Sequence, residues 1–345
     1  MAELPVTVAP ARLRIVVLGG GTGTFTVLTG LKYHELDISA VVSTSDDGGS
    51  TGILRSELGV LPPGDIRQCL VALSDGDEIL RRMFNYRFSE GSLSGHNFGN
   101  LFLTVLEKVC KHPLEAVRQA HNILRERGQV IPVSEQATQL FARLVTGEVI
   151  NGEHAIDETT VKRAPIDRCF IDPEIEANPD AIDAIRKADA IVMGPGDLFT
   201  SLIPVILVGG IVDAICESRA TRILVTNLVT KHGQTDGFKA SDFCRVVEEY
   251  IGPAKLDRII VNTSEPPPEV LKAYEEAEDQ LVVDDLGHDT RRIFRAPLIS
   301  DRMSKKVAGD KLKRSVLRHD PAKLATAILE SISPDRTTDA LGRNA

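Results

Sequence analysis

The residues most suited to binding an anion lie in a glycine-rich turn near the start of the chain. Residues 14–18 have the composition of a buried strand, and apolar residues recur at helical spacing from Thr24 onward. Glycine lets the backbone approach a ligand closely, and the N–H groups that begin a helix point toward a bound anion. We therefore expect a nucleotide phosphate to contact the residues of this turn, namely Gly20, Gly21, Thr22 and Gly23.

The spacing of these glycines departs from the dinucleotide fingerprint G-x-G-x-x-G. Thr26 stands where the third glycine belongs, and the P-loop pattern G-x-x-x-x-G-K-[ST] does not occur in the sequence. The turn therefore indicates a nucleotide ligand, but it does not establish that the ligand is a nicotinamide dinucleotide. An NAD(P)-binding oxidoreductase is retained as an alternative function.

Two carboxylates follow the second predicted strand, which covers residues 38–44, and a third follows a Pro-Pro-Gly turn. Carboxylate oxygens are the ligands that Mg²⁺ prefers when it bridges phosphates, so Asp47 and Asp65 are the candidate metal ligands. The same acids also suit turns and helix caps, and Asp46 or Asp47 would suit a ribose hydroxyl. The nucleotide-contacting candidates of the first acidic turn are Asp46, Asp47, Gly48, Gly49 and Ser50.

A histidine and two asparagines lie at the start of a helix predicted over residues 98–109. His96 is placed to contact a phosphate or to act as an acid, and Asn97 and Asn100 are placed to hydrogen-bond a base, a sugar or a phosphate. The alternative is structural, because Asn97 is also a favourable N-cap residue for that helix.

A second strand-turn-helix arrangement resembles the first. Residues 188–193 are predicted to form a strand, and the Gly-Pro-Gly-Asp turn after it leads into a helix that Asp197 is expected to cap. The strand predicted over 223–226 precedes a third polar loop, in which Lys231 and His232 are placed to offset phosphate charge. The nucleotide-contacting candidates of these two loops are Gly194, Pro195, Gly196, Asp197, Asn227 and Thr230.

A parallel sheet would bring these loops to one edge. Strand-like and helix-like segments alternate along the chain, which predicts an α/β fold: a Rossmann-like, doubly wound, mostly parallel sheet in a single nucleotide-binding domain over residues 12–334. Helical periodicity over about 62–127 predicts a helical insert, and short strands over about 130–171 predict a small β-rich insert. Residues 335–345 are predicted to be a mobile tail.

Composition excludes several classes of partner. The 345 residues include 4% aromatic residues and no tryptophan, and the formal net charge of -9 opposes binding to nucleic acid or anionic lipid. Five widely spaced cysteines without a C-x-x-C pair indicate neither a disulfide framework nor a zinc site, and no apolar run is long enough to span a membrane. We expect a cytoplasmic protein without a tightly bound organic cofactor.

In their order along the chain, these motifs resemble those of the bacterial gluconeogenesis factor family, which belongs with the 2-phospho-L-lactate transferases of deazaflavin coenzyme synthesis. The resemblance runs from about Arg14 to about Asn262, and its most specific parts are the Pro-Pro-Gly-Asp and Gly-His-Asn signatures. The residues that carry it are Gly19 to Gly23, Asp46 to Ser50, Leu61 to Arg67, Gly95 to Asn97, Gly99, Asn100, Gly194 to Gly196, and Asn227.

The resemblance implies a Rossmann-like fold and a nucleotide or nucleotide-sugar ligand such as UDP-N-acetylglucosamine. It implies a regulator, with no established reaction and no assigned catalytic residue, that is needed for cell shape and envelope synthesis on gluconeogenic carbon sources. The transferase branch offers the alternative of a Mg²⁺-dependent enzyme that holds its metal on Asp47 and Asp65. The resemblance is compatible with a homodimer, and it does not identify a regulatory protein partner.

Overall fold

Seven parallel strands form the central sheet of the protein. The computed structural model describes residues 12–76, 78–157, 163–276, 279–288, 292–301 and 317–332. The strands of the sheet are β1 (Leu13–Gly19), β2 (Leu36–Val42), β3 (Gln129–Pro132), β7 (Ala190–Met193), β8 (Thr221–Val225), β9 (Arg258–Asn262) and β10 (Ile293–Ala296). Their order is β10-β9-β8-β7-β1-β2-β3, and every neighbouring pair is parallel. The predicted doubly wound α/β fold is confirmed.

The direction in which the sheet grows reverses at β1. From β1 the chain builds through β2 to β3, and it then returns to the other side of β1 to build β7, β8, β9 and β10. In open parallel sheets, ligands bind outside the carboxyl ends of the strands at such a switch point. The loops after β1 and β7 both leave the sheet here, so the topology brings two of the predicted loops together.

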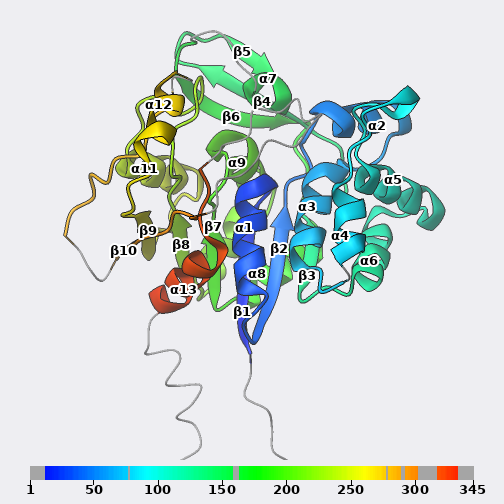
Figure 1. The fold of residues 1–345 in the computed structure, drawn as a ribbon, viewed down its shortest axis with the longest axis horizontal. Coiled ribbons are helices and arrows are strands. Elements are labelled where there is room, and N and C mark those ends of the chain that lie inside the picture. Colours follow the sequence, from blue (N-terminus) through cyan, green and yellow to red (C-terminus); the bar gives the residue numbers. More distant parts are fainter. Residues whose placement is uncertain are drawn as a thin grey trace, which may run out of the picture.

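Helices cover both faces of this sheet, as a buried parallel sheet requires. One layer contains α1 (Gly21–Leu31), α3 (Pro63–Leu73) and α13 (Pro321–Ser331), and the other contains α8 (Pro179–Lys187), α9 (Ile203–Ile206), α10 (Ile211–Glu217) and α11 (Ala240–Tyr250). Side chains of β1 alternate between the two layers: Ile15 and Val17 join the core under α1, whereas Val16 and Leu18 join the core under α9. Figure 1 shows α1 and α13 in front of the sheet.

The predicted helical insert lies beside β2 and β3 and includes α3. Its further elements are α4 (Glu78–Asn85), the 3-10 turn η1 (Gly91–Leu93), α5 (Phe98–Cys110) and α6 (Pro113–Leu124). The buried Phe84 ring fixes α4 against α5, with its centroid 6.2 Å from that of Phe98 and 5.0 Å from that of Phe102. A further helix, α2 (Gly49–Leu58), precedes the insert where the sequence indicated only a turn.

The β-rich insert forms a separate antiparallel sheet over one edge of the main one. Its strands are β4 (Gln139–Leu144), β5 (Val149–Asn151) and β6 (Ile166–Asp172), in the order β5-β4-β6, and the short helix α7 (Glu153–Asp157) follows β5. The first strand of the predicted segment, β3, pairs with β2 in the main sheet. In Figure 1 the insert lies at the top, above the carboxyl ends of the central strands.

The remaining elements complete the second half of the sheet. A π-helical turn, η2 (Leu198–Leu202), follows the loop after β7, and α12 (Pro268–Glu276) lies between β9 and β10. The predicted tail, residues 335–345, lies outside the described residues. Among the helices of the described residues, none combines the length and the apolar composition that crossing a membrane requires.

Candidate functional site

The loop after β1 packs against the loop after β7. A Cβ atom on Gly23 would lie 2.0 Å from the backbone oxygen of Pro195, so this contact requires glycine. The loop after β8 joins the same place, because the Asn227 side-chain amide donates to the Gly196 carbonyl oxygen over 2.9 Å. Three of the loops predicted from the sequence therefore meet at the carboxyl edge of the sheet.

The first N–H group of α1 is bound to a carboxylate. Gly21 N–H donates to Asp65 Oδ1 over 2.9 Å, and a Cβ atom on Gly20 would lie 2.0 Å from Asp65 Oδ2. Gly20 is the N-cap residue of α1 and has no side chain to cap it. Asp65 thus takes the position that a bound anion takes at a helix N-terminus.

Asp46 lies beside Asp65. A Cβ atom on Gly64 would lie 2.4 Å from Asp46 Oδ2, and Gly48 N–H donates to Asp46 Oδ1 over 2.9 Å. Burial and the charge of Asp46 raise the pKa of Asp65 to about 7, against the opposing effect of its bond from Gly21 N–H. Burial raises the pKa of Asp46 as well. Paired carboxylates with raised pKa values are typical of functional sites.

Asp47 faces the β-rich insert. Its Oδ2 accepts a hydrogen bond from Gln139 Nε2 on β4, and its Oδ1 accepts one from the backbone N–H of His154 on α7, each over 2.7 Å. A Cβ atom on Gly152 would lie 2.8 Å from Asp47 Oδ2. Both oxygens of this predicted metal ligand therefore hold the insert over the carboxyl edge.

The predicted histidine and asparagines lie near the start of α2. Ser50 Oγ is 3.1 Å from His96 Nδ1, and Asn97 N–H donates to Ser50 Oγ over 3.4 Å. Asn97 Oδ1 accepts the N–H of Asn100, which is the N-cap bond of α5, and Asn100 Oδ1 accepts from the buried Arg67 over 2.8 Å. The capping role of Asn97 is confirmed, and His96 is part-exposed beside it.

Lys231 connects the loop after β8 to the β-rich insert. Its ammonium contacts Asp157 Oδ1 at the end of α7 and donates to Asp197 Oδ2 over 2.8 Å. Asp197 is the N-cap residue of η2, but its side chain makes no capping bond. The expectation that it caps this helix is wrong, because the ammonium takes its carboxylate. Thr230 is buried, and its Oγ1 accepts the N–H of Gln280 over 2.9 Å.

Glu153 on α7 is a residue of the site that no sequence motif indicated. Its Oε2 lies 3.9 Å from the position of a Cβ atom on Gly48. Burial, together with repulsion from Asp46, Asp157 and two further carboxylates, raises the pKa of Glu153 well above its usual range. The side chain therefore faces the carboxylates of the predicted loops. Only the folding of the β-rich insert brings it there, and local periodicity carries no signal for that contact.

Asp46 and Asp65 present oxygens that suit Mg²⁺. This ion is commonly held by one or two carboxylates, while phosphate and water oxygens complete its octahedron. Among the described residues, Asp65 Oδ2 receives no hydrogen bond, so it is available to a cation. The same part of the chain contains no group of three or more His, Cys, Asp and Glu side chains arranged to hold a metal. A cation at these two carboxylates would therefore take its remaining bonds from ligand phosphates and water.

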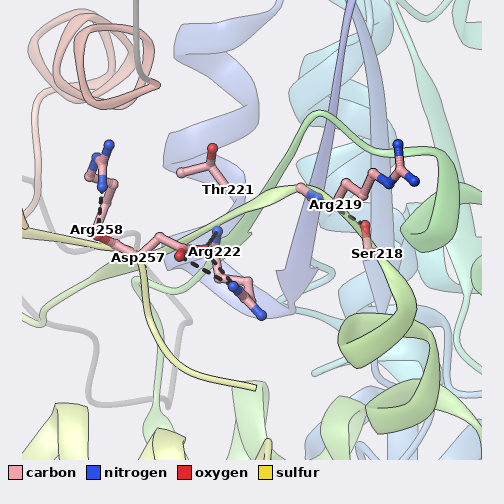
Figure 2. A pocket seen from close by; sticks show the side chains of 7 residues that line it. Ser218, Arg219, Thr221, Arg222, Asp257 and Arg258 are labelled. Atoms are coloured by element: carbon pink, nitrogen blue, oxygen red, sulfur yellow. Dashed lines mark hydrogen bonds and ion pairs between the residues drawn. The ribbon is translucent and has the colours of Figure 1, made fainter. Parts of the chain in front are cut away.

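A cavity of about 310 Å³ opens at the opposite, amino edge of the sheet, and Figure 2 shows the side chains that line it. Arg222 donates to the two oxygens of Asp257 over 2.8 and 3.2 Å. Arg258 donates to the backbone oxygens of Asp257 and Ser331 over 2.9 and 3.0 Å. These arginines serve the internal structure, whereas the predicted loops after β1, β2, β7 and β8 leave the carboxyl ends of their strands. The candidate site is therefore the carboxyl edge.

Comparison with known proteins agrees with this architecture. The family model described as 2-phospho-L-lactate transferase CofD matches residues 15–300. A putative gluconeogenesis factor of Thermotoga maritima is 40% identical over 322 residues, which cover 93% of this chain and 99% of that protein. The gluconeogenesis factor of Bacillus subtilis is 35% identical over 319 residues, which cover 92% of this chain and 97% of that protein.

A solved structure gives the same result for the fold. A crystal structure of a UPF0052 family member from Bacillus halodurans matches with a TM-score of 0.85 and 34% sequence identity, covering 93% of this chain and 99% of that one. The chain therefore belongs to the CofD family and is a relative of the gluconeogenesis factors.

Proposed function

We propose that this protein binds a nucleotide sugar of the UDP-N-acetylglucosamine kind at the carboxyl edge of its sheet and acts as a regulator. The observation that supports this most directly is the meeting of three loops at the switch point, where Gly23 contacts Pro195 and Asn227 binds the Gly196 carbonyl. Open parallel sheets bind nucleotides at this place. Kinship with proteins called gluconeogenesis factors supports a regulatory role.

A regulator is favoured over an enzyme because the pairing at this edge that resembles a nucleophile beside a base is committed to structure. Ser50 Oγ contacts His96, which resembles a nucleophile beside a base, but the same oxygen accepts the Asn97 N–H and the residue is buried. A hydroxyl that must attack a substrate has to be reachable. We infer that ligand occupancy is the signal, and that it couples nucleotide-sugar supply to cell shape and envelope synthesis on gluconeogenic carbon sources.

A Mg²⁺-dependent transferase of the phospholactyl type is the second candidate. The adjacent carboxylates of Asp46 and Asp65 and the CofD family match favour it. In such a reaction an acceptor hydroxyl loses its proton and takes the phospholactyl group from a lactyl ester of a nucleoside diphosphate, and a nucleoside monophosphate leaves as the P–O–P bond breaks. Bound Mg²⁺ would neutralise the diphosphate charge. In this chain Asp46 and Asp65 would hold the ion, and Gly21 N–H fixes the orientation of Asp65.

Isothermal titration of the full chain separates these functions. UDP-N-acetylglucosamine, GDP and NAD are each titrated with and without Mg²⁺, and the samples are then assayed for product. The regulator predicts saturable binding of the UDP sugar without turnover. A Mg²⁺-dependent preference for the guanine nucleotide supports the transferase, and binding of NAD alone supports an oxidoreductase.

A variant pair tests whether the ligand uses the predicted edge. Asn227→Ala removes the amide that joins the loops after β7 and β8. It is expected to weaken UDP-sugar binding by about tenfold, since a lost hydrogen bond at a closed loop costs about 1–2 kcal/mol. Glu174→Gln changes an exposed residue after β6 and serves as the control. Equal affinities of the two variants would contradict the proposed location.

A further inference from the structure

We propose that α7 contacts the sugar of the bound nucleotide sugar, with the Glu153 carboxyl oxygens accepting hydrogen bonds from its hydroxyl or acetamido N–H groups. The inference rests on the proposed function and identifies the part of the site that distinguishes a nucleotide sugar from the bare nucleotide. Glu153 would determine specificity and would take no part in a reaction.

Bonds near both ends hold α7 to the main sheet. Near its start, the backbone N–H of His154 donates to Asp47 Oδ1 over 2.7 Å. At its end, Asp157 Oδ1 accepts from the Lys231 ammonium and, over 3.1 Å, from Gln234 Nε2. Because these partners belong to the loops after β2 and β8, α7 has a fixed position over the carboxyl edge.

Glu153 faces the edge from this fixed helix. Glu153 and Asp157 are four residues apart, so they lie on the same side of α7. Glu153 Oε2 is 3.9 Å from the position of a Cβ atom on Gly48, at the start of α2. Within the described residues, the part-buried Glu153 carboxyl group accepts no hydrogen bond. Its oxygens are therefore open to a ligand that donates hydrogen bonds.

Gln234 supplies an independent observation at the same junction. Its side chain comes from the loop after β8, is uncharged and is only 3% exposed. Its Nε2 is bound to Asp157, whereas its Oε1 is buried without a hydrogen-bond partner. A buried amide oxygen that lacks a donor costs about 1–3 kcal/mol, which a donor on a ligand would recover. Beside α7, a neutral acceptor and a carboxyl acceptor thus both lack donors.

The chemistry of this junction suits hydroxyl groups rather than phosphates. The charges of Asp46 and Asp157 already repel a charge on Glu153, and a phosphate placed directly against this side chain would add to that repulsion. Sugar hydroxyls and an acetamido N–H are neutral donors, and carboxyl and amide oxygens are their complementary acceptors. The sugar therefore fits below α7, and the phosphates fit farther along the edge.

Titration of UDP-N-acetylglucosamine and of UDP into the same protein tests this assignment. The full chain is compared as wild type, Glu153→Ala and Glu153→Gln, with Glu174→Gln as an exposed control. We expect Glu153→Ala to lower the ratio of UDP-sugar affinity to UDP affinity about tenfold, as expected for the loss of one hydrogen bond. The affinity for UDP itself is expected to stay constant, because UDP lacks the sugar that this side chain would contact.

Glu153→Gln keeps an oxygen acceptor and the shape of the side chain, so it is expected to lower the ratio by only about threefold. If the alanine variant does not fold, the affinity ratio of Glu153→Gln alone is compared with that of the wild type. A ratio that stays at the wild-type value in both variants overturns the inference, and so does an equal loss of UDP and UDP sugar, which would indicate a structural role. Failure of the wild type to bind the UDP sugar overturns the proposed function, and this inference with it.

Discussion

The backbone N–H of Gly21 donates to Asp65 Oδ1 over 2.9 Å, so a side chain of the protein occupies the anion position of its first glycine loop. A ligand phosphate that approaches α1 therefore meets a carboxylate before it meets the helix. The negative charges repel each other unless a cation lies between them. The Gly21–Asp65 contact thus joins the glycine loop and the Pro-Pro-Gly-Asp turn into one functional unit.

Replacing Asp65 by asparagine is expected to abolish the effect of Mg²⁺ on nucleotide binding. The wild type is expected to bind UDP-N-acetylglucosamine about tenfold more tightly with Mg²⁺, which corresponds to about 1.4 kcal/mol. Asp65→Asn keeps an oxygen that accepts the Gly21 N–H but removes the charge. Titrations with Mg²⁺ and with a chelator provide the measurement. The same Mg²⁺ effect in both proteins would show that Asp65 is not a metal ligand.

A methyl group at Gly23 is expected to force two loops apart. The Cβ atom of Gly23→Ala would lie 2.0 Å from the Pro195 oxygen, and overpacking of this kind costs about 1–3 kcal/mol. Gly287→Ala is the matched control, because its Cβ would meet no atom within 4 Å. Urea denaturation measures the free energy of unfolding of each variant. The control variant is expected to differ from the wild type by less than about 0.5 kcal/mol. Equal stability of the two variants would argue against the close approach.

The charges of Lys231 and Asp157 are expected to be energetically coupled. Their side chains are 27% and 22% exposed, so the pair is worth less than a fully buried one, and we expect a coupling free energy of about 1 kcal/mol. This coupling free energy is obtained by comparing the free energies of unfolding of the wild type with those of Lys231→Met, Asp157→Asn and the double variant. Hydrogen exchange of the α7 amides is expected to accelerate in each single variant. Additive free energies would mean that this contact does not hold the insert.

Stability is expected to fall as the pH rises from about 5 to about 8, and Glu126 is one source of the fall. Its side chain is fully buried, with Oε2 3.1 Å from His121 Nδ1. Burial raises the pKa of Glu126 to about 7, above that of the unfolded chain, so the folded state retains a proton that the unfolded state loses.

Glu126→Gln cannot ionise, so its free energy of unfolding is expected to fall less than that of the wild type over this pH range. Urea titrations at about pH 5 and about pH 8 provide the comparison. An unchanged pH dependence would show that Glu126 titrates normally in the folded protein.

Local patterns predicted the elements that form the edge of the sheet. The strands β1 and β7 are short apolar runs that end in glycine turns, and both features are visible within a few residues of sequence. These two features were sufficient to predict the parallel sheet and the loops that begin at Gly20 and Gly194. The helix α2 was missed because its first turn is Gly-Ser-Thr-Gly, and glycine, serine and threonine have weak helix propensity.

Contacts between distant segments could not be predicted in the same way. Asp47 and Gln139 are 92 positions apart, and Asp157 and Lys231 are 74 apart. The insert that carries Glu153 reaches the site only through such pairs, and neither hydrophobic periodicity nor turn composition encodes which pair forms. The predicted role of Asp197 as a helix cap failed for the same reason, since its partner lies in another loop.

Hydrogen exchange with and without UDP-N-acetylglucosamine tests the central claim most directly, because it locates the ligand on the folded chain. At saturating ligand, we predict slower exchange in the loops after β1, β7 and β8 and in α7, with no change around the amino-edge cavity at Arg222 and Asp257. Protection confined to that cavity, or no protection anywhere, would contradict a nucleotide-sugar site at the carboxyl edge.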